Sequence, residues 1–593
     1  MINWKVQTHY DGEYVSYEDL ILKRVPIEDK HSYKYPNHKY DIDPRCYYNM
    51  EKGVKIFNDV LKINKNITIL VDVDVDGYTS ASMLRMAIKA HSTCDVNIVH
   101  HKTKKHGLYD EVIDEIMKTE PMLLIIPDAA SNDIEEIWNL GKYMDVIVID
   151  HHDISNERYY DKDIDIQHGL CLINNQAKWN KDSNPHLTGS GLTLRFLQEF
   201  YRFRGYDMGY KYYDLAMMGL IGDMADYSDL EIRNIVFKGL ENINNELLKV
   251  ALKDKIPHVY KYEPMDIAFN FNPFINAITR MATMEEKEMV FNALSDNYIN
   301  ATHNVQKRRK IRGKMQLVNI TQTRYEYVYD IMSRVKGKQD RTVKKLEEEL
   351  YGDISNHGGV AIGLIDEEFR GITGLVANRV ASNLKKPTLL LRKKQGDSEL
   401  SGSARGYTRV LDDFKTWCQD TELFHLAEGH DNAFGIKIYE HYIDDLINQS
   451  KVVKKQDKTY HVDIIFNDFN RVTRDDIMTL NKLTYLTGGS VDQLKLSLNN
   501  YTVDKDNVKS FNSVTKINTK EGVELIIFND NGATVDLLNK TMGNEIQIDV
   551  VGIPSINVWF NKTTPQIIVD DIQIHRENNI IGEQPRKINK PIF

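Results

Sequence analysis

The sequence has few of the features that mark secreted, disulfide-bonded or membrane-spanning proteins. Its 593 residues include only four cysteines, none with the close spacing of a zinc or redox motif. No apolar run approaches the ~18 residues that cross a membrane, and the first residues lack the basic and apolar regions of a secretory signal. We therefore expect a soluble protein of the reducing cytoplasm.

An overall excess of positive charge is also missing. The formal net charge is −10, so the composition as a whole does not indicate a nucleic-acid-binding protein. Basic residues are concentrated locally, most densely in residues 307–314, and again in residues 336–345, 385–394 and 451–458. Each stretch alone is typical of a solvated helix face or linker. Together they would allow a cationic channel on an acidic protein.

The chain is too long for one hydrophobic core. Between residues 67 and 150, short apolar runs alternate with amphipathic runs of about ten residues, which is typical of a doubly wound parallel sheet. A second α/β module is predicted from Gly358 onward, and the residues between the modules favour helices. Short strands between Asn, Gly and Pro turns indicate a terminal β-barrel like the OB-fold. The predicted parts are an N-terminal extension (1–60), a first α/β domain (61–235), a helical connector (236–350), a second α/β domain (351–450) and the barrel (457–580).

Titratable side chains follow several of the predicted strands of the first domain. The apolar run Val146–Ile149 ends in a carboxylate and two imidazoles, and carboxylates also follow the first and third strands. Because parallel strands place their carboxyl ends at one edge of the sheet, these side chains should meet there. A further carboxylate ends the apolar segment before residue 223. The residues placed at this edge are Asp72, Asp74, Asp76, Asp128, Asp150, His151, His152 and Asp223.

Carboxylate oxygens with imidazole nitrogens suit manganese or magnesium, and zinc less so without thiolates. Five or six such ligands exceed what one catalytic ion needs and match a pair of ions about 3.5–4 Å apart. Such a pair of ions clamps the attacking and leaving oxygens of a phosphoryl displacement. Taken alone, the alternating carboxylates of residues 72–76 are equally typical of a solvated strand face, and Asp76-Gly77 of a plain turn. Their occurrence in order at successive strand ends favours a phosphodiester-hydrolysing metal site.

With these residues in place, the sequence resembles the DHH phosphoesterase superfamily and, within it, the RecJ-type single-strand-specific exonucleases. Four motifs carry the resemblance: Val71–Ser80, the segment around Asp128, Asp150–His152 and Gly222–Met224. Four downstream segments are also similar to that family: Ile275–Arg280, Gly374–Arg379, Ser401–Arg405 and Glu428–Gly435. The likeness implies two α/β lobes, a DHH domain and a DHH-associated domain, joined by helices and followed by an OB-like barrel.

The resemblance also implies residue roles. Two manganese or magnesium ions would be held by Asp74, Asp76, Asp128, His151 and Asp223, with Asp128 as the bridge. His152 would contact the scissile phosphate and act in catalysis with Asp76 and Asp128, while Asp72 and Asp150 would support the ligands from behind. The residues implied to bind DNA phosphates are Arg280, Arg379, Ser403, Arg405 and His430.

Three positions depart from the family pattern. Leu70 stands where many DHH enzymes have a histidine, and Asp72 could compensate for it. The second motif reads Pro127-Asp-Ala-Ala instead of the commoner Asp-x-Gly, and Glu428 replaces a glycine, which would alter loop geometry near the phosphate pocket. None of these changes removes a residue from the implied set of metal ligands.

The expected activity is metal-dependent hydrolysis of single-stranded DNA from the 5′ end to mononucleotides, in DNA repair or recombination. The protein would act as a monomer, with a helicase or single-strand-binding protein as a further partner. Its many Lys, Asn and Ile residues suit a low-GC bacterium or a phage-infected cell. Two alternatives stay open: a phosphodiesterase of short oligonucleotides or cyclic dinucleotides, which the connector and barrel argue against, and an inactive replication scaffold, which the intact ligands argue against.

Overall fold

The chain divides into two compact units, one of residues 27–455 and one that joins residues 1–26 to residues 456–593. The structure is a computed structural model. It describes residues 4–8, 16–101, 106–160, 169–259, 261–295, 301–311, 313–350, 358–394, 396–408, 410–453, 458–467, 470–511, 513–528, 533–539, 544–559 and 562–575.

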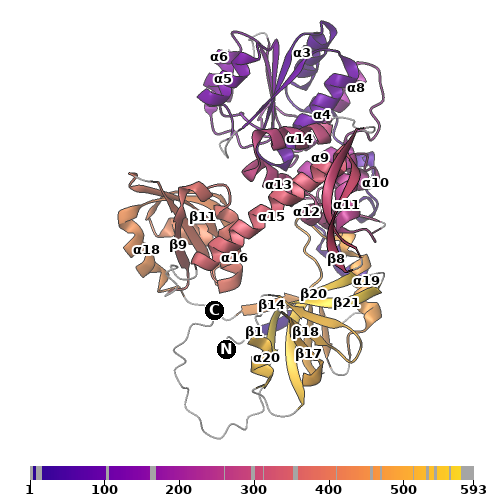
Figure 1. Ribbon diagram of the computed structural model, residues 1–593, viewed down its shortest axis with the longest axis vertical. Coiled ribbons are helices and arrows are strands. Elements are labelled where there is room, and N and C mark those ends of the chain that lie inside the picture. Colours follow the sequence, from indigo (N-terminus) through magenta and orange to yellow (C-terminus); the bar gives the residue numbers. More distant parts are fainter. Residues whose placement is uncertain are drawn as a thin grey trace. The chain divides into compact units, whose positions relative to one another are not determined.

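A five-stranded parallel sheet forms the centre of the first lobe of the larger unit (Figure 1). Its strand order is β3-β2-β4-β5-β6, and each pair of neighbours runs parallel. The strands are β2 (Ile67–Val71), β3 (Val96–His100), β4 (Leu123–Pro127), β5 (Asp145–Asp150) and β6 (Leu170–Asn174). The helices around it are α3 (Met50–Lys62), α4 (Val75–His91), α5 (Asp110–Lys118), α6 (Ile134–Leu140), α8 (Gly189–Phe203) and α9 (Tyr213–Gly222). The predicted doubly wound α/β domain is confirmed.

Strand β5 shows why these strands are apolar along their whole length. Successive side chains of a strand point to opposite faces of the sheet. Ile147 and Ile149 belong to the core that includes α3, α4, α8 and α9, whereas Val146 and Val148 belong to the core under α5 and α6. Helices cover both faces (Figure 1), and these four side chains are fully buried. The strand therefore stays apolar until it reaches the open edge at Asp150.

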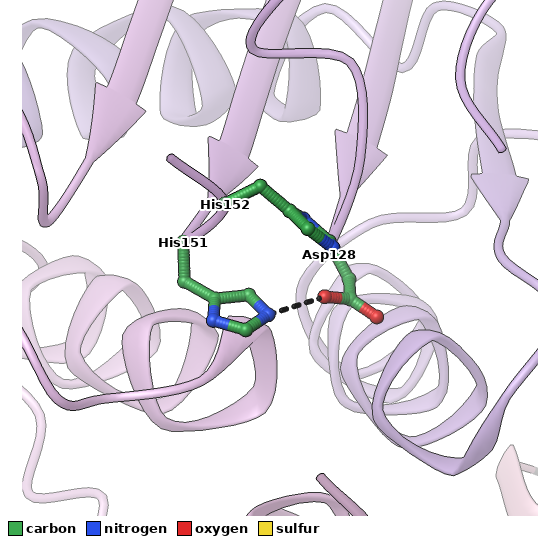
Figure 2. A group of neighbouring side chains, drawn as sticks. All are labelled: Asp128, His151 and His152. Carbon is green, nitrogen blue, oxygen red and sulfur yellow. Dashed lines mark ion pairs between the residues drawn. The ribbon is translucent and has the colours of Figure 1, made fainter. Parts of the chain in front are cut away.

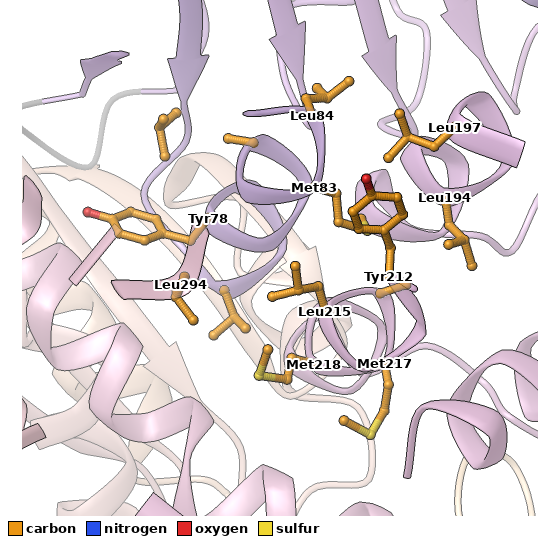
Figure 3. Close-up of a cluster of buried hydrophobic side chains, with 14 of the residues drawn as sticks. Tyr78, Met83, Leu84, Leu194, Leu197, Tyr212, Leu215, Met217, Met218 and Leu294 are labelled. Atoms are coloured by element: carbon orange, nitrogen blue, oxygen red, sulfur yellow. The ribbon is translucent and has the colours of Figure 1, made fainter. Parts of the chain in front are cut away.

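Helices α4, α8 and α9 pack together through large aliphatic and sulfur-containing side chains (Figure 3). Met83 and Leu84 of α4, Leu194 of α8, and Leu215 and Met218 of α9 are fully buried in this core. The packing fixes the amino end of α4 against the carboxyl end of α9. Both helix ends carry acidic residues, so the core brings those residues to the same place.

The second lobe of the larger unit is a five-stranded mixed sheet in the order β12-β13-β11-β10-β9. Strands β9 and β10 are parallel, and the remaining neighbours are antiparallel. Its strands are β9 (Ala361–Asp366), β10 (Thr388–Lys393), β11 (Glu399–Arg405), β12 (Phe424–His430) and β13 (Ala433–Tyr439). Its helices are α16 (Thr373–Leu384), α17 (Phe414–Asp420) and α18 (Ile443–Ser450). The prediction of a second α/β lobe is thus confirmed.

The segment between the lobes is mainly helical, as expected. Its helices are α10 (Leu230–Glu241), α11 (Glu246–Lys255), α12 (Pro264–Asn270), α13 (Asn272–Met281), α14 (Met284–Ser295) and α15 (Arg324–Leu350). The larger unit also begins with α2 (Lys30–Lys34). None of the helices in the described ranges is long and apolar enough to cross a membrane.

The prediction that the basic stretch 307–314 lies on helices is wrong. Strands β7 (Thr302–Ile311) and β8 (Lys314–Thr323) form an antiparallel hairpin there. Val305, Val318 and Ile320 alternate with polar residues at the period of two that is typical of strands. The density of basic residues in this stretch hid that period from the sequence analysis.

In the smaller unit, the expected OB-like β-barrel is not confirmed. Seven strands form one sheet in the order β15-β16-β20-β21-β19-β18-β17, and within the described ranges its edge strands β15 and β17 do not pair with each other. Strand β20 continues through Gly552 and Pro554, where the sequence suggests a turn, because a register shift between Val551 and Gly552 absorbs the irregularity. The strands are β15 (Ile464–Asn467), β16 (Leu496–Asp504), β17 (Val508–Phe511), β18 (Val514–Asn518), β19 (Glu524–Ile527), β20 (Glu545–Trp559) and β21 (Lys562–Ile574).

The amino-terminal residues contribute to the smaller unit. Strand β1 (Trp4–Thr8) pairs in parallel with β14 (Lys458–Val462). Arg24 Nη1 lies 2.8 Å from Asp463 Oδ2, which ties the segment after β1 to the start of the seven-stranded sheet. The helices of this unit are α1 (Tyr17–Arg24), α19 (Arg474–Lys482) and α20 (Ala533–Asn539).

Candidate metal centre

Five side chains from four segments meet at the carboxyl edge of the parallel sheet. Asp74 caps the amino end of α4 and Asp76 lies in its first turn. Asp128 directly follows β4, His151 directly follows β5, and Asp223 follows the last residue of α9. The structure thus brings together all five residues expected to hold metal ions, although Asp223 comes from a helix end instead of a strand end. We call these five residues the ligand cluster.

The imidazole of His151 lies at the centre of the ligand cluster. Its Nε2 atom is 3.2 Å from Asp128 Oδ1, 3.6 Å from Asp223 Oδ2 and 4.0 Å from Asp76 Oδ2. Figure 2 shows the ring pointing at the Asp128 carboxylate. Three sets of potential ligand atoms lie within 4.8 Å of one another: Asp76, His151 and Asp223; Asp128, His151 and His152; and Asp72, Asp74 and Asp128.

The carboxylates of the ligand cluster repel one another. Burial raises the pKa of Asp128 well above its usual value, and the charges of Asp76 and Asp74 raise it further. For the same reasons, burial first and then neighbouring carboxylates, the pKa of Asp223 rises to about 8 and that of Asp74 to about 6. Oxygens Oδ2 of Asp76 and Oδ1 of Asp128 are buried without a hydrogen-bond donor. Buried oxygens that lack donors and repel one another fit divalent cations.

Asp76 is held from behind by the segment before α8. Its Oδ1 atom accepts hydrogen bonds from Thr188 Oγ1 at 2.8 Å and from the Ser190 amide at 3.1 Å. These two bonds leave Oδ2 turned toward His151. Thr188 and Ser190 could not be predicted from the sequence, because no signal in their segment distinguishes them from an ordinary helix start.

Asp72 is held by two histidines that the sequence analysis also missed. His106 Nδ1 lies 2.7 Å from Asp72 Oδ2, and His101 Nδ1 lies 3.1 Å from Asp72 Oδ1. Burial opposes ionisation of Asp72, but these two imidazoles lower its pKa to about 2. Leu70, at the position of the family's histidine, is buried in the core instead. The strand-end rule that identified Asp150 would also have found His101, which directly follows β3.

Asp150 lies beneath the ligand cluster and holds His152. Its carboxylate accepts hydrogen bonds from the amides of Ser131 at 3.0 Å and His151 at 2.7 Å, and from His152 Nδ1 at 2.7 Å. The hydrogen bond that His152 donates to Asp150 raises the pKa of His152 to about 9. Burial would raise the pKa of Asp150, but the hydrogen bond from His152, the charges of the two imidazoles and the bond from the Ser131 amide together hold that pKa below the usual range. His152 is 52% exposed and carries its proton at neutral pH.

The backbone after β4 adopts an uncommon conformation that positions Asp128. Asp128 and Ala130 have φ angles of 64° and 78°, in the left-handed region that disfavours residues with a Cβ atom. Ala130 occupies the glycine position of the commoner Asp-x-Gly motif. The conformation is retained without glycine, and the Asp128 amide donates to the Ile149 carbonyl at 2.8 Å.

Two arginines lie beyond the ligand cluster. Arg280, on α13, has a buried Nε atom without a hydrogen-bond acceptor among the described residues. Burial lowers the pKa of Arg280, and the charge of Asp74 raises it. The pKa of Arg405, on β11, is lowered by burial and by the charge of Arg280. A Cβ atom at Gly374 would lie 2.5 Å from Arg405 Nη2 and 3.7 Å from Ser403 Oγ. A side chain at Gly374, near the start of α16, would therefore displace the end of the Arg405 side chain.

The remaining two residues expected to bind phosphate are Arg379 and His430. Arg379 Nη1, on α16, is 3.7 Å from Glu347 Oε2 on α15. His430 is exposed at the end of β12, and none of the described side chains forms a hydrogen bond or ion pair with it. The contacts that the structure describes thus give neither Arg379 nor His430 a partner in the ligand cluster.

The sequence matches known proteins over nearly its whole length. The model of the DHH family, N-terminal domain, matches residues 66–220, a range that holds every residue of the ligand cluster except Asp223. An SPbeta prophage-derived protein of Bacillus subtilis, with the provisional name single-strand DNA-specific exonuclease YorK, is 30% identical over 578 residues. The match covers 94% of this chain and 96% of that protein. The chain belongs to the DHH family.

More distant DHH relatives include the RecJ proteins. The single-stranded-DNA-specific exonuclease RecJ of Thermus thermophilus is 24% identical over 366 residues, which cover 60% of this chain and 49% of RecJ. A crystal structure of RecJ with Mn²⁺ from Thermus thermophilus superimposes with a TM-score of 0.66 at 16% identity, and covers 96% of this chain and 79% of RecJ. The structure of the same protein with Mg²⁺ gives a TM-score of 0.61. These superpositions show a shared fold.

The ligand cluster of this DHH protein predicts a pH-dependent stability in the absence of cations. Asp223 has a pKa of about 8 in the fold against 3.8 ordinarily, so between these values the folded protein keeps a proton that the unfolded chain has released. Stability should therefore fall as the pH rises from about 6 to 8 and then level off. In EDTA, the melting temperature of the Asp223→Asn variant should fall less over this range than that of the parent.

Asp153→Asn is the matched control, because Asp153 is exposed and follows the same strand as His151. It should retain the pH dependence of the parent. Equal slopes for the parent and Asp223→Asn would contradict this account of the cluster.

Proposed function

We propose that this protein is a metal-dependent exonuclease that hydrolyses single-stranded DNA. One observation carries the proposal: the ligand cluster gathers buried carboxylate oxygens without donors around His151, next to the arginine pair Arg280 and Arg405. An anionic substrate with a phosphodiester bond matches this combination of a cation site and fixed positive charge. The names of the prophage-derived relative and of the RecJ proteins support single-stranded DNA as the substrate.

We assign the ligands to two divalent cations, Mn²⁺ or Mg²⁺. Asp76, His151 and Asp223 would hold one ion, and Asp74 with Asp128 would hold the other, with Asp128 shared between them. Such ions supply an activated water molecule and neutralise charge on the reacting phosphate. The RecJ structures with Mn²⁺ and with Mg²⁺ support this choice of metal.

The protein's own groups bind and orient the substrate. His152, protonated through its bond to Asp150, donates to a phosphate oxygen and stabilises the negative charge that develops there. Arg280 and Arg405 bind phosphates through charge-assisted hydrogen bonds, which give the unpartnered Arg280 Nε an acceptor. Ser403 and His430 are proposed as further DNA contacts. Arg379 would have to leave Glu347 to join them.

The same proposal includes digestion from the 5′ to the 3′ end and release of mononucleotides. It also includes a monomeric state and cooperation with a helicase or a single-strand-binding protein. A cytoplasmic location agrees with the four free cysteines. Hydrolysis of cyclic dinucleotides or short oligonucleotides is the second candidate activity, because the ligand cluster alone would serve either substrate. An inactive scaffold has less support, because every member of the ligand cluster is present.

Replacement of Asp128 by asparagine tests the proposed function. Asparagine keeps the shape of the side chain but removes the shared ligand charge, so hydrolysis should fall by at least about 10³-fold. The assay uses single strands labelled at the 5′ or 3′ end, a blunt duplex and a cyclic dinucleotide, with Mn²⁺ or with EDTA. Release of label over time gives the direction of digestion.

The exposed Asp153→Asn variant should hydrolyse the single strand as the parent does. Activity on the single strand that EDTA abolishes would support the proposal. Activity confined to the cyclic dinucleotide would select the second candidate, and full activity of Asp128→Asn would contradict the assignment of the site.

Asp150→Asn tests the role of His152. The substitution removes the charge that holds the pKa of His152 near 9, so this pKa should move toward 6.5. A protonated His152 is lost as the pH rises through its pKa, and the alkaline limb of kcat/KM against pH should therefore move to lower pH. An unchanged alkaline limb, with lower activity at every pH, would mean that Asp150 has only a structural role.

A further inference from the structure

The β7–β8 hairpin differs in charge from the rest of the protein. Residues 301–323 contain six basic residues and no acidic residue, in a chain whose net charge is −10. Figure 1 shows the two strands as a long twisted ribbon. Two strands of ten residues each reach about 33 Å, close to one turn of duplex DNA.

One face of the hairpin is anchored on α15. The His303 ring stacks on Tyr327, with ring centroids 4.4 Å apart and an interplanar angle of 13°. Lys307 forms an ion pair with Asp330, and the Gln322 side chain donates to the same carboxylate at 2.9 Å. These contacts hold the ribbon by its inner face, so the opposite face is free to serve a partner.

The outer face of the hairpin is exposed and carries groups that bind nucleic acids. The register pairs Asn304 with Thr321, Gln306 with Asn319, and Arg308 with Leu317 on this face, and all six residues are exposed. Arg308, on this face, forms no ion pair with any residue that the structure describes. The same holds for Lys314, the first residue of β8. Amide, hydroxyl and guanidinium groups are those that contact phosphates and base edges.

The shape and composition of the hairpin indicate which form of nucleic acid it binds. Proteins that hold single strands use aromatic side chains on which bases stack, and residues 301–323 contain no Phe, Tyr or Trp. A two-stranded antiparallel ribbon instead fits the major groove of a duplex, which is about 12 Å wide. A duplex therefore suits the ribbon better than a single strand.

We propose that the β7–β8 hairpin binds duplex DNA that adjoins the single strand under digestion. The inference rests on the proposed function, because it identifies the substrate as a single strand attached to a duplex. The outer face would lie in the groove, where Arg308 would contact a phosphate. Lys314, the first residue of β8, would contact a phosphate from the end of the hairpin. Loading on such a junction would place the single-stranded end near the ligand cluster more often than free diffusion would.

A double substitution, Arg308→Gln with Lys314→Gln, tests this inference. Binding is measured in EDTA by fluorescence anisotropy, with a single strand, a duplex of about two helical turns, and the same duplex with a single-stranded tail. The variant should bind the duplex and the tailed duplex about 10- to 100-fold more weakly, and its salt slope should fall by about 0.9 for each lost phosphate contact. Its affinity for the single strand should stay within about twofold of the parent.

The matched control removes two charges from the first lobe, with Lys55→Gln and Lys65→Gln. These lysines are exposed in α3 or in the turn between α3 and β2, and the control should bind the duplex as the parent does. Equal losses on the single strand and the duplex, or no loss on either, would overturn the inference. Failure of the parent to hydrolyse any single strand would instead overturn the proposed function, so the two failures can be told apart.

Discussion

The structure depends on the mutual repulsion of carboxylates at one edge of a parallel sheet. Asp76 and Asp128 are buried, Asp74 is half-buried and Asp223 is exposed at the rim of the cluster. Loss of hydration and the charges of neighbouring carboxylates raise the pKa of Asp74, Asp128 and Asp223. A fold maintains such an arrangement only if the surrounding structure is rigid and a bound positive charge lowers the electrostatic energy of the carboxylates. Divalent cations do so and at the same time provide the chemistry of phosphodiester hydrolysis.

The fold supplies that rigidity from several directions. Strand β5 is buried on both faces, and the core of α4, α8 and α9 fixes the helix ends that carry Asp76 and Asp223. Two carboxylates next to the ligand cluster have imidazole partners: Asp72 contacts two histidines, and Asp150 holds protonated His152. Asp74, Asp128 and Asp223, whose pKa values are raised by neighbouring carboxylates, therefore mark the place where cations would bind.

Much of this arrangement could be predicted from sequence because it follows from topology. Consecutive parallel strands must end at one edge, so carboxylates and imidazoles after β2, β4 and β5 had to converge. The contacts of Thr188, Ser190 and His106 could not be predicted, because they depend on how loops fold back over the edge. Local periodicity also failed twice: basic residues hid the strands of the hairpin, and a register shift let β20 run through Gly552 and Pro554 without a turn.

The most direct test of the central claim is the number of Mn²⁺ ions that the purified protein binds, measured by equilibrium dialysis or electron paramagnetic resonance. The parent should bind two ions with spectra that show coupling between them, and Asp128→Asn should lose that coupling together with at least one ion. A parent protein that binds no Mn²⁺, or an Asp128→Asn variant with an unchanged stoichiometry and spectrum, would contradict the account.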